Sequence, residues 1–157
     1  MIITECYKDT VLVHRIGFPG DQVKHEFGRS RVLGRVEQKQ KAVIGIIDED
    51  PGTGQPLKMK EYEFQSGDTK AIRLLKKKDD KTKRLIQICP RLEDWLYVVA
   101  KRNRISPDKF GLPNNPCALH SRSLRGDDDF HKFLIALNKT KDDELNTLKR
   151  WIKEAIE

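Results

Sequence analysis

The sequence has few of the residues that stabilise small proteins through disulfide bonds or bound zinc. Only three cysteines occur in 157 residues, and Cys6, Cys89 and Cys117 lie far apart with no Cys-x-x-Cys pair. The four histidines are equally scattered, with no two of them four residues apart. This spacing argues against a disulfide framework and against a zinc module. We therefore expect reduced thiols, as in a cytosolic protein.

Long apolar stretches are also missing. No run of 18 or more apolar residues occurs, so no segment has the pattern of a membrane-spanning helix. Residues 1–5 already have the pattern of a strand, which differs from the charged and apolar regions of a signal peptide. We expect a cytoplasmic protein with no membrane partner, and its length fits one domain.

The most informative stretch is a short apolar run, Val43 to Ile47, that ends abruptly in acid. A continuous Val/Ile run bounded by Pro51 and Gly52 is typical of a strand buried on both faces of a parallel sheet. The acids then lie at the carboxyl end of the strand, where open α/β sheets bind ligands. The pleat predicts that Asp48 and Asp50 point to one side and Glu49 to the other. Two such oxygen donors suit Mg²⁺.

The order of the patterns predicts an α/β fold with a mainly parallel central sheet, because strands and helices alternate in the first third of the chain. The predicted strands are residues 2–4, 22–27, 43–48, 59–64, 71–75 and 84–88, the last two forming a β-hairpin. The predicted helices are one closed by Gly17, then 28–41, 91–104, one beginning near Asp127, and one capped by Thr140 with Asp143. Residues 106–116 are expected to form an irregular connection.

Positive charge is concentrated in the predicted hairpin. The formal net charge is +7, and residues 70–84 contain eight basic side chains, Lys70 included, against two acidic ones. Such a segment is typical of a phosphate-binding surface. We therefore expect nucleic acid as a partner, with contacts from Lys76, Lys77, Lys78 and Arg84. A solvated pair of strands with lysines protecting an edge is the structural alternative.

A second basic group opens the helix predicted at 28–41. Arg29, Arg31 and Arg35 lie near its start, where unpaired amide groups can bind a phosphate. Arginines on a solvated helix face are the more ordinary interpretation.

Two short motifs occur at the ends of predicted strands. The first is Ile-Ile-Thr-Glu-Cys-Tyr-Lys-Asp at residues 2–9, and the second is Ile-Ile-Asp-Glu-Asp at 46–50. Together they resemble the glutamate motif and the Asp-x-Asp motif of TOPRIM domains, which occur in topoisomerases, bacterial primases and nucleases of the overcoming-lysogenization-defect family. Residues 92–96 are similar to a Glu-x-Trp-Leu element of small stand-alone relatives, some of them linked to phage defence.

The resemblance implies a TOPRIM-like fold and a metal-dependent phosphodiester-processing activity. It implies one domain over residues 1–157, with a motif-bearing core at 1–55 and the remaining strands and C-terminal helices at 56–157. The implied protein is a nuclease that acts on nucleic acid with Mg²⁺ or Mn²⁺.

The resemblance also implies roles for particular acids. Asp48 and Asp50 would hold the first metal ion. Glu5 would complete that site or act as a general acid or base, and Asp9 would help to bind a second ion. Glu93 is an additional candidate ligand, although a glutamate in the first turn of a helix is favoured by the helix dipole in any case.

Other interpretations stay open at this stage. Cys6 stands where TOPRIM domains usually have glycine, which favours a non-catalytic TOPRIM-like module that binds nucleic acid or protein in a defence or toxin-antitoxin system. Residues 48–53 also resemble the nucleophile loop of haloacid-dehalogenase phosphatases, but Thr53 comes one residue later than that motif requires. Asp-Glu-Asp-Pro-Gly is, in addition, ordinary turn chemistry. A homodimer is left open.

Overall fold

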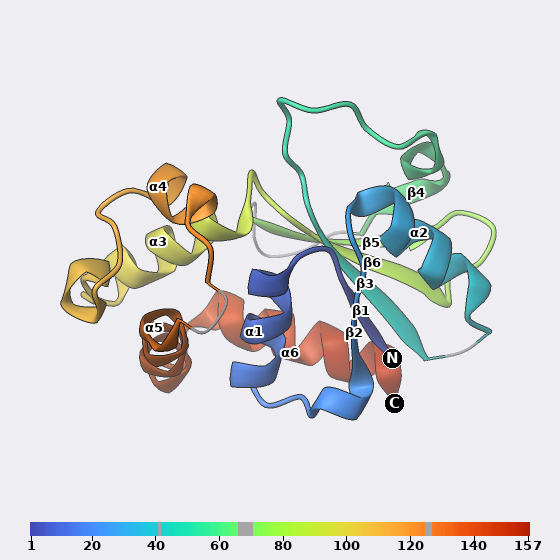
Figure 1. The fold of residues 1–157 in the computed structure, drawn as a ribbon. Helices are drawn as coiled ribbons and strands as arrows, with labels where there is room; N and C mark the ends of the chain where they lie inside the picture. Colours follow the sequence, from blue (N-terminus) through green and yellow to red (C-terminus); the bar gives the residue numbers. More distant parts are fainter. Residues whose placement is uncertain (41, 66–70, 125–126) are drawn as a thin grey trace.

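The protein is built on one six-stranded mixed sheet with helices on both faces (Figure 1), seen in a computed structural model that describes residues 1–40, 42–65, 71–124 and 127–157. The strands are β1 (Ile2–Thr4), β2 (Val23–His25), β3 (Val43–Asp48), β4 (Tyr62–Phe64), β5 (Ile72–Lys77) and β6 (Lys83–Ile88). Their order across the sheet is β2-β1-β3-β6-β5-β4. The first four in this order are parallel, and β5 and β4 are antiparallel additions. The predicted α/β class, the mainly parallel sheet and the β5–β6 hairpin are confirmed.

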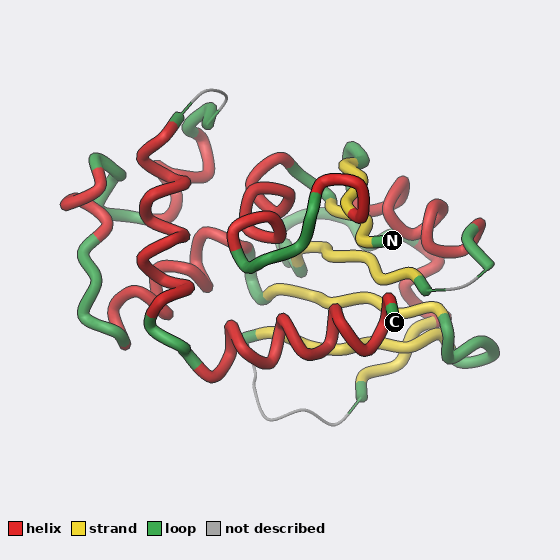
Figure 2. The backbone as a smooth tube through the Cα atoms, turned by 90° about the horizontal axis from the view of Figure 1, so that it is seen from below, coloured by secondary structure: helices red, strands yellow, loops and turns green. Residues whose placement is uncertain are grey.

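The helices divide between the two faces of the sheet. They are α1 (Tyr7–Arg15), α2 (Arg29–Gln38), α3 (Leu92–Arg102), α4 (Pro116–Ser121), α5 (Asp128–Lys139) and α6 (Asp143–Ile156). Helix α2 contacts β3 from one face, and α6 contacts β3 and β5. Figure 2 shows α6 running alongside the strands, and the two chain termini lie near each other in both views.

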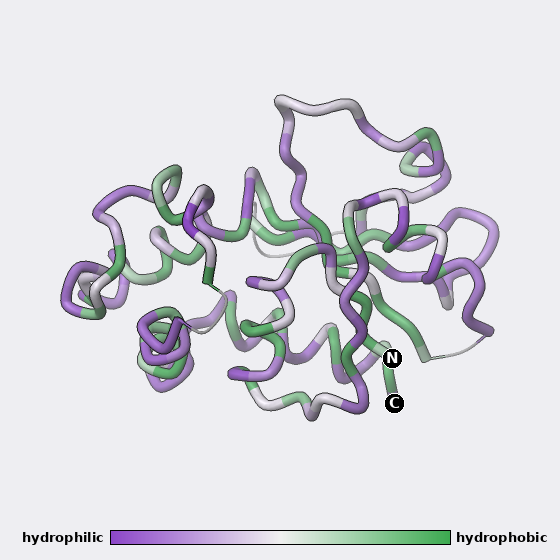
Figure 3. The backbone as a smooth tube through the Cα atoms, in the orientation of Figure 1, coloured by the Kyte–Doolittle hydropathy of each residue, from purple (hydrophilic) through white to green (hydrophobic). Residues whose placement is uncertain are grey.

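Strand β3 is apolar throughout because both of its faces are buried. Ile44 and Ile46 enter a large core shared with α1, α3, α5 and α6, whereas Val43 and Ile47 enter a smaller core beneath α2. No position between Val43 and Ile47 faces water, so none needs a polar side chain. Figure 3 shows the same distribution, with apolar segments gathered along the strands and polar segments in the outer loops.

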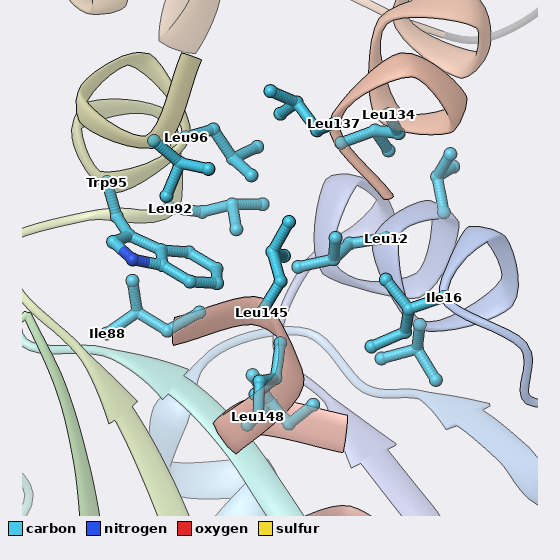
Figure 4. Close-up of a cluster of buried hydrophobic side chains, with 14 of the residues drawn as sticks. Leu12, Ile16, Ile88, Leu92, Trp95, Leu96, Leu134, Leu137, Leu145 and Leu148 are labelled. Atoms are coloured by element: carbon cyan, nitrogen blue, oxygen red, sulfur yellow. The ribbon is translucent and has the colours of Figure 1, made fainter. Parts of the chain in front are cut away.

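The larger core joins segments that are far apart in the sequence. Figure 4 shows Leu145 of α6 between Leu12 of α1 and the α3 side chains Leu92 and Trp95. Leu134 of α5 belongs to the same buried cluster. The C-terminal helices therefore complete the core beneath the sheet, and they position α1 and α3 at its carboxyl edge.

Gly45 allows α2 to approach β3 closely. A Cβ atom at this position would lie 2.7 Å from Leu85 Cδ2 and 2.8 Å from Val32 Cγ1. Neither neighbour has room to retreat, because Leu85 and Val32 are both fully buried. The single glycine inside the strand thus serves helix packing.

Several local predictions need correction. The cap of α6 is Asp142, which accepts hydrogen bonds from Glu144 N and Leu145 N, so the predicted Thr140 cap is wrong. Thr140 ends α5 instead. Helix α4 was not predicted, and the strand expected at 59–64 is limited to β4. The predicted helix end at Lys41 and the basic residue Lys70 lie outside the described residues.

Within the described ranges, no helix has both the length and the apolar character needed to cross a bilayer.

Candidate functional site

The two sequence motifs meet at the carboxyl edge of the sheet. Strands β1 and β3 are parallel neighbours, so Glu5, which follows β1, lies beside Asp48, which ends β3. The contact is direct, because Asp48 N donates a hydrogen bond of 2.9 Å to Glu5 Oε2. Burial raises the pKa of Glu5, although the bond from Asp48 and the charge of Arg29 oppose the shift.

Asp48 is held between the sheet and α3. Its Oδ1 accepts a 3.0 Å hydrogen bond from Leu92 N, the first amide of that helix. Burial, together with the charges of Asp9, Glu5 and Glu93, raises the pKa of Asp48 to about 9, against the hydrogen bond from Leu92. Four carboxyl groups therefore lie close enough to repel one another.

Asp9 is the most deeply buried of the four, with 1% of its surface exposed. Its Oδ2 accepts a 3.0 Å hydrogen bond from Cys6 N, which caps α1. Its Oδ1 is buried and has no hydrogen-bond partner in the part of the chain that is described. Burial raises the pKa of Asp9 to about 7, against the bonds from Cys6, and the charges of Glu5 and Glu93 raise it as well.

Cys6 does not strain the turn in which TOPRIM domains usually have glycine. Its φ is −135° and its ψ is 171°, an extended conformation that any residue adopts. The glycine-to-cysteine departure therefore does not disturb the local backbone. Burial and the nearby Asp9 charge raise the pKa of the Cys6 thiol, so it remains protonated at neutral pH.

Glu93 is buried, with only 2% of its surface exposed. Its Oε1 lies 3.1 Å from Lys8 Nζ and 3.2 Å from His120 Nδ1. Its Oε2 is buried without a hydrogen-bond partner among the described groups. Lys8 also donates to the carbonyl oxygens of Leu119 and His120, at 2.8 and 2.9 Å, and so fastens α4 to α1.

The prediction that Asp48 and Asp50 point to the same side is corrected by the backbone. Strand β3 ends at Asp48, and Asp50 has a φ of 41°, so the pleat does not extend to it. Asp50 N donates to Pro90 O at 2.8 Å, and its Oδ2 accepts from Thr53 Oγ1 at 3.3 Å. Asp50 lies near Glu5, because both line the same cavity and the charge of Asp50 contributes to raising the pKa of Glu5. Glu49 forms a separate ion pair of 3.0 Å with Arg73.

A cavity of about 700 Å³ opens beside Glu5 and Asp50. Segment 49–56 and the start of α2 leave the sheet at this edge (Figure 1), and both line the cavity. Arg29 fixes the two walls to each other, because it donates to Glu49 O at 2.7 Å, to Gly54 O at 3.2 Å and to Thr53 Oγ1. Its Nε also lies 4.0 Å from Glu5 Oε1. Of the arginines singled out in the sequence, Arg29 and Arg31 line this cavity.

The basic hairpin lies at the opposite end of the sheet from the acids. Lys83 is in register with Val43 at the start of β3, whereas Ile88 is in register with Asp48 at its end. Five residue steps along a strand separate these ends by about 17 Å. Nucleic-acid contacts from the hairpin, as predicted from the sequence, would therefore lie at the opposite end of the strands from the acids.

Three of the four predicted nucleic-acid contacts have partners within the protein. Lys77 lies 3.5 Å from Glu37 and 3.4 Å from Glu61. Lys78 donates to Lys60 O at 2.8 Å, and Arg84 donates to Glu154 O at 2.9 Å. The fourth predicted contact, Lys76, pairs in register with Arg84 and Glu63 on the neighbouring strands.

The acids suit a hard cation in chemistry, but they do not form a complete cage. In the described ranges, no group of three or more His, Cys, Asp or Glu side chains is arranged to hold a metal ion. The donors are nevertheless all oxygens, and two of them, Asp9 Oδ1 and Glu93 Oε2, are buried without partners. Mg²⁺ commonly binds one or two carboxylates and takes its other ligands from water and substrate phosphates. The oxygen donors therefore suit Mg²⁺ in their chemistry, although the described side chains do not by themselves complete its coordination.

Two side chains that contact the acidic cluster were not singled out in the sequence, Lys8 and His120. Lys8 lies between two motif acids, which could have drawn attention to it, whereas nothing in the sequence linked His120 to Glu93.

Comparisons with the models of known protein families, with curated proteins and with solved structures found no match to this chain.

Proposed function

We propose that the protein is a metal-dependent phosphodiester hydrolase with a TOPRIM-like fold, and specifically a nuclease that uses Mg²⁺ or Mn²⁺. The observation that supports this proposal is the convergence of Glu5, Asp9, Asp48 and Glu93 from three separate segments of the chain. Burial and mutual repulsion make this arrangement costly for the folded protein unless protons or a cation neutralise it. Such clusters are typical of sites that bind and process charged ligands.

Each residue has a role that its position supports. Asp48, Asp50 and Glu5 would hold the first cation, and Asp9 and Glu93 offer oxygens for a second. A bound Mg²⁺ would polarise a phosphoryl oxygen and stabilise the charge that develops on it. Glu5, whose pKa is raised, can hold or release a proton at the mouth of the cavity. Arg29 supplies positive charge beside Glu5, where a phosphate would enter.

A second candidate is a TOPRIM-like module that binds nucleic acid without cleaving it. The lack of a three-acid cage among the described side chains favours this candidate. The two differ in whether phosphodiester bonds are broken when metal is present.

The test is a cleavage assay on supercoiled and on single-stranded circular DNA with Mg²⁺ or Mn²⁺. We expect cleavage by the wild type and a loss of about 100-fold or more in the Asp48→Asn variant. This substitution keeps an oxygen that can accept from Leu92 N. Glu49→Gln is the matched control, because Glu49 is the next residue and pairs with Arg73 outside the cluster.

The other outcomes identify the alternatives. Binding of DNA without cleavage under every metal condition would support the non-catalytic module. Hydrolysis of p-nitrophenyl phosphate that survives Glu5→Gln would support the haloacid-dehalogenase type of phosphatase.

A further inference from the structure

An exposed aromatic ring lies in the wall of the cavity beside the acids. Phe27 follows β2, lines the same cavity as Glu5 and Asp50, and is 71% exposed. Leaving most of a phenylalanine side chain in water forgoes the stabilisation that burial provides. A single exposed apolar residue is ordinary on a protein surface, but this one lines a cavity that Glu5 and Asp50 of the candidate site also line.

The ring is held in place by its neighbours. It packs against His25, with ring centroids 4.6 Å apart and the planes tilted by 55°. Gly28, the next residue, has a φ of 89° and donates a 3.4 Å hydrogen bond to Glu5 O. The backbone that carries Phe27 is therefore tied to the backbone that carries Glu5.

Charge in the same cavity changes sign over a short distance. Arg29 and the exposed Arg31 lie on the first turn of α2, immediately after Phe27, while Glu5 and Asp50 line the other part. A phosphate is attracted to the arginines, and a flat apolar group is attracted to the ring. A nucleotide carries both groups on one small unit.

Exposed aromatic side chains occur mainly at the carboxyl edge of the sheet. The exposed aromatic side chains of the described residues are Tyr7, Phe27 and Phe64. Tyr7 begins α1 two residues after Glu5, so two of the three follow the ends of neighbouring strands. Phe64 lies on β4, the edge strand at the far side of the sheet, and provides a natural control.

We propose that Phe27 stacks on an unpaired nucleobase whose phosphate lies against the exposed Arg31, so that the substrate is a single-stranded nucleic acid. This inference rests on the proposed function for the chemical class of the ligand. A paired base in a duplex already has both faces covered by its neighbours, whereas an unpaired base offers its face to an aromatic ring. DNA and RNA share this chemistry.

Binding is measured separately from cleavage. Fluorescence anisotropy of labelled oligothymidylate and oligouridylate of about twelve nucleotides, and of a blunt duplex of equal length, is recorded with Ca²⁺ in place of Mg²⁺. We expect Phe27→Ala to weaken single-strand binding about tenfold, Phe27→Trp to retain it, and the duplex to bind more weakly with no dependence on Phe27. Phe64→Ala should bind as the wild type does. A 2-aminopurine base in the oligonucleotide should be quenched by the wild type and not by Phe27→Ala.

The results separate this inference from the proposed function. Phe27-dependent binding without metal-dependent cleavage by the wild type would support the stacking role and reject the nuclease. Cleavage that continues while Phe27→Ala binds single strands as tightly as the wild type would reject the stacking role alone. The inference is also overturned if Phe64→Ala loses as much affinity, if the duplex shows the same dependence on Phe27, or if the wild type binds no single strand.

Discussion

The acidic cluster at the carboxyl edge of the sheet and a second one at the start of α6 differ in what surrounds them. At the start of α6, Asp142 accepts two hydrogen bonds of 2.9 Å from Arg102 and another of 2.9 Å from Asn103. Burial alone would raise the pKa of Asp142, but these bonds and the Arg102 charge outweigh burial and hold that pKa below its usual value. Glu144 lies 2.9 Å from the same guanidinium group.

In the cluster at the carboxyl edge of the sheet, burial and the repulsion between carboxylates outweigh the hydrogen bonds that the acids accept. Asp48 and Asp9 have raised pKa values, and the main cationic partner of Glu93, Lys8, is shared with two carbonyl oxygens. Both clusters include acids in the first turn of a helix, so position on a helix does not distinguish them. The comparison teaches that the paired cluster stabilises the fold, while the underpaired cluster is held in place by the fold at a cost in stability.

The largest expected effect comes from breaking the paired cluster. Asp142→Ala removes the cap of α6 and leaves Arg102 without its bidentate partner, so we expect a loss of about 3 kcal/mol in the free energy of unfolding. Chemical denaturation measures this loss. Asp143→Ala, one residue further along and exposed, is the control and should change stability by less than about 0.5 kcal/mol. Equal losses in the two variants would contradict the comparison.

The underpaired cluster should respond to metal. At a concentration ten times the dissociation constant, Mg²⁺ or Mn²⁺ should stabilise the wild type by about 1.4 kcal/mol, visible as a rise in Tm. Asp48→Asn should abolish the rise, and Glu49→Gln should keep it. If millimolar Mg²⁺ and Mn²⁺ leave the melting curve of the wild type unchanged, the metal assignment loses its support.

The two clusters should also differ in pH dependence. Asp48 has a folded pKa above its unfolded value, so the folded state binds more protons and metal-free stability falls as pH rises from about 4 towards 9. Asp142 has a lowered folded pKa, so its contribution is present above the unfolded pKa and is lost on acidification. Between pH 5 and 8, we expect the stability of Asp48→Asn to rise relative to that of the wild type in EDTA, by at most about 1.4 kcal/mol for each pH unit. A constant difference between these two proteins across that range would count against the raised pKa.

The smallest effect is expected at the basic hairpin. Lys78→Gln changes a side chain at the opposite end of the strands, about 17 Å from the acids. At this separation, salt screens most of the interaction between exposed charges. The cleavage rate of this variant should stay within about twofold of the wild-type rate. Its free energy of unfolding should stay within about 0.5 kcal/mol of the wild-type value. A tenfold loss in the cleavage rate of Lys78→Gln would instead indicate that the hairpin takes part in substrate binding or catalysis.

Much of the fold follows from local patterns. Residue spacing and turn residues act locally, so short stretches of sequence predict several features. These are the burial of β3 on both faces, the order of strands and helices, and the apolar stripes of α5 and α6. The same patterns placed Glu5 and Asp48 at one edge, since parallel neighbours end on the same side.

What the sequence by itself determined was therefore the set of elements and the edge at which the motif acids meet. Only the tertiary structure decided that the hairpin lysines point away from that edge, that Asp50 leaves the pleat, and that Lys8 and His120 reach Glu93 from α1 and α4. The reason is physical: these relations depend on strand order and on contacts between segments more than 20 residues apart, which no local periodicity encodes.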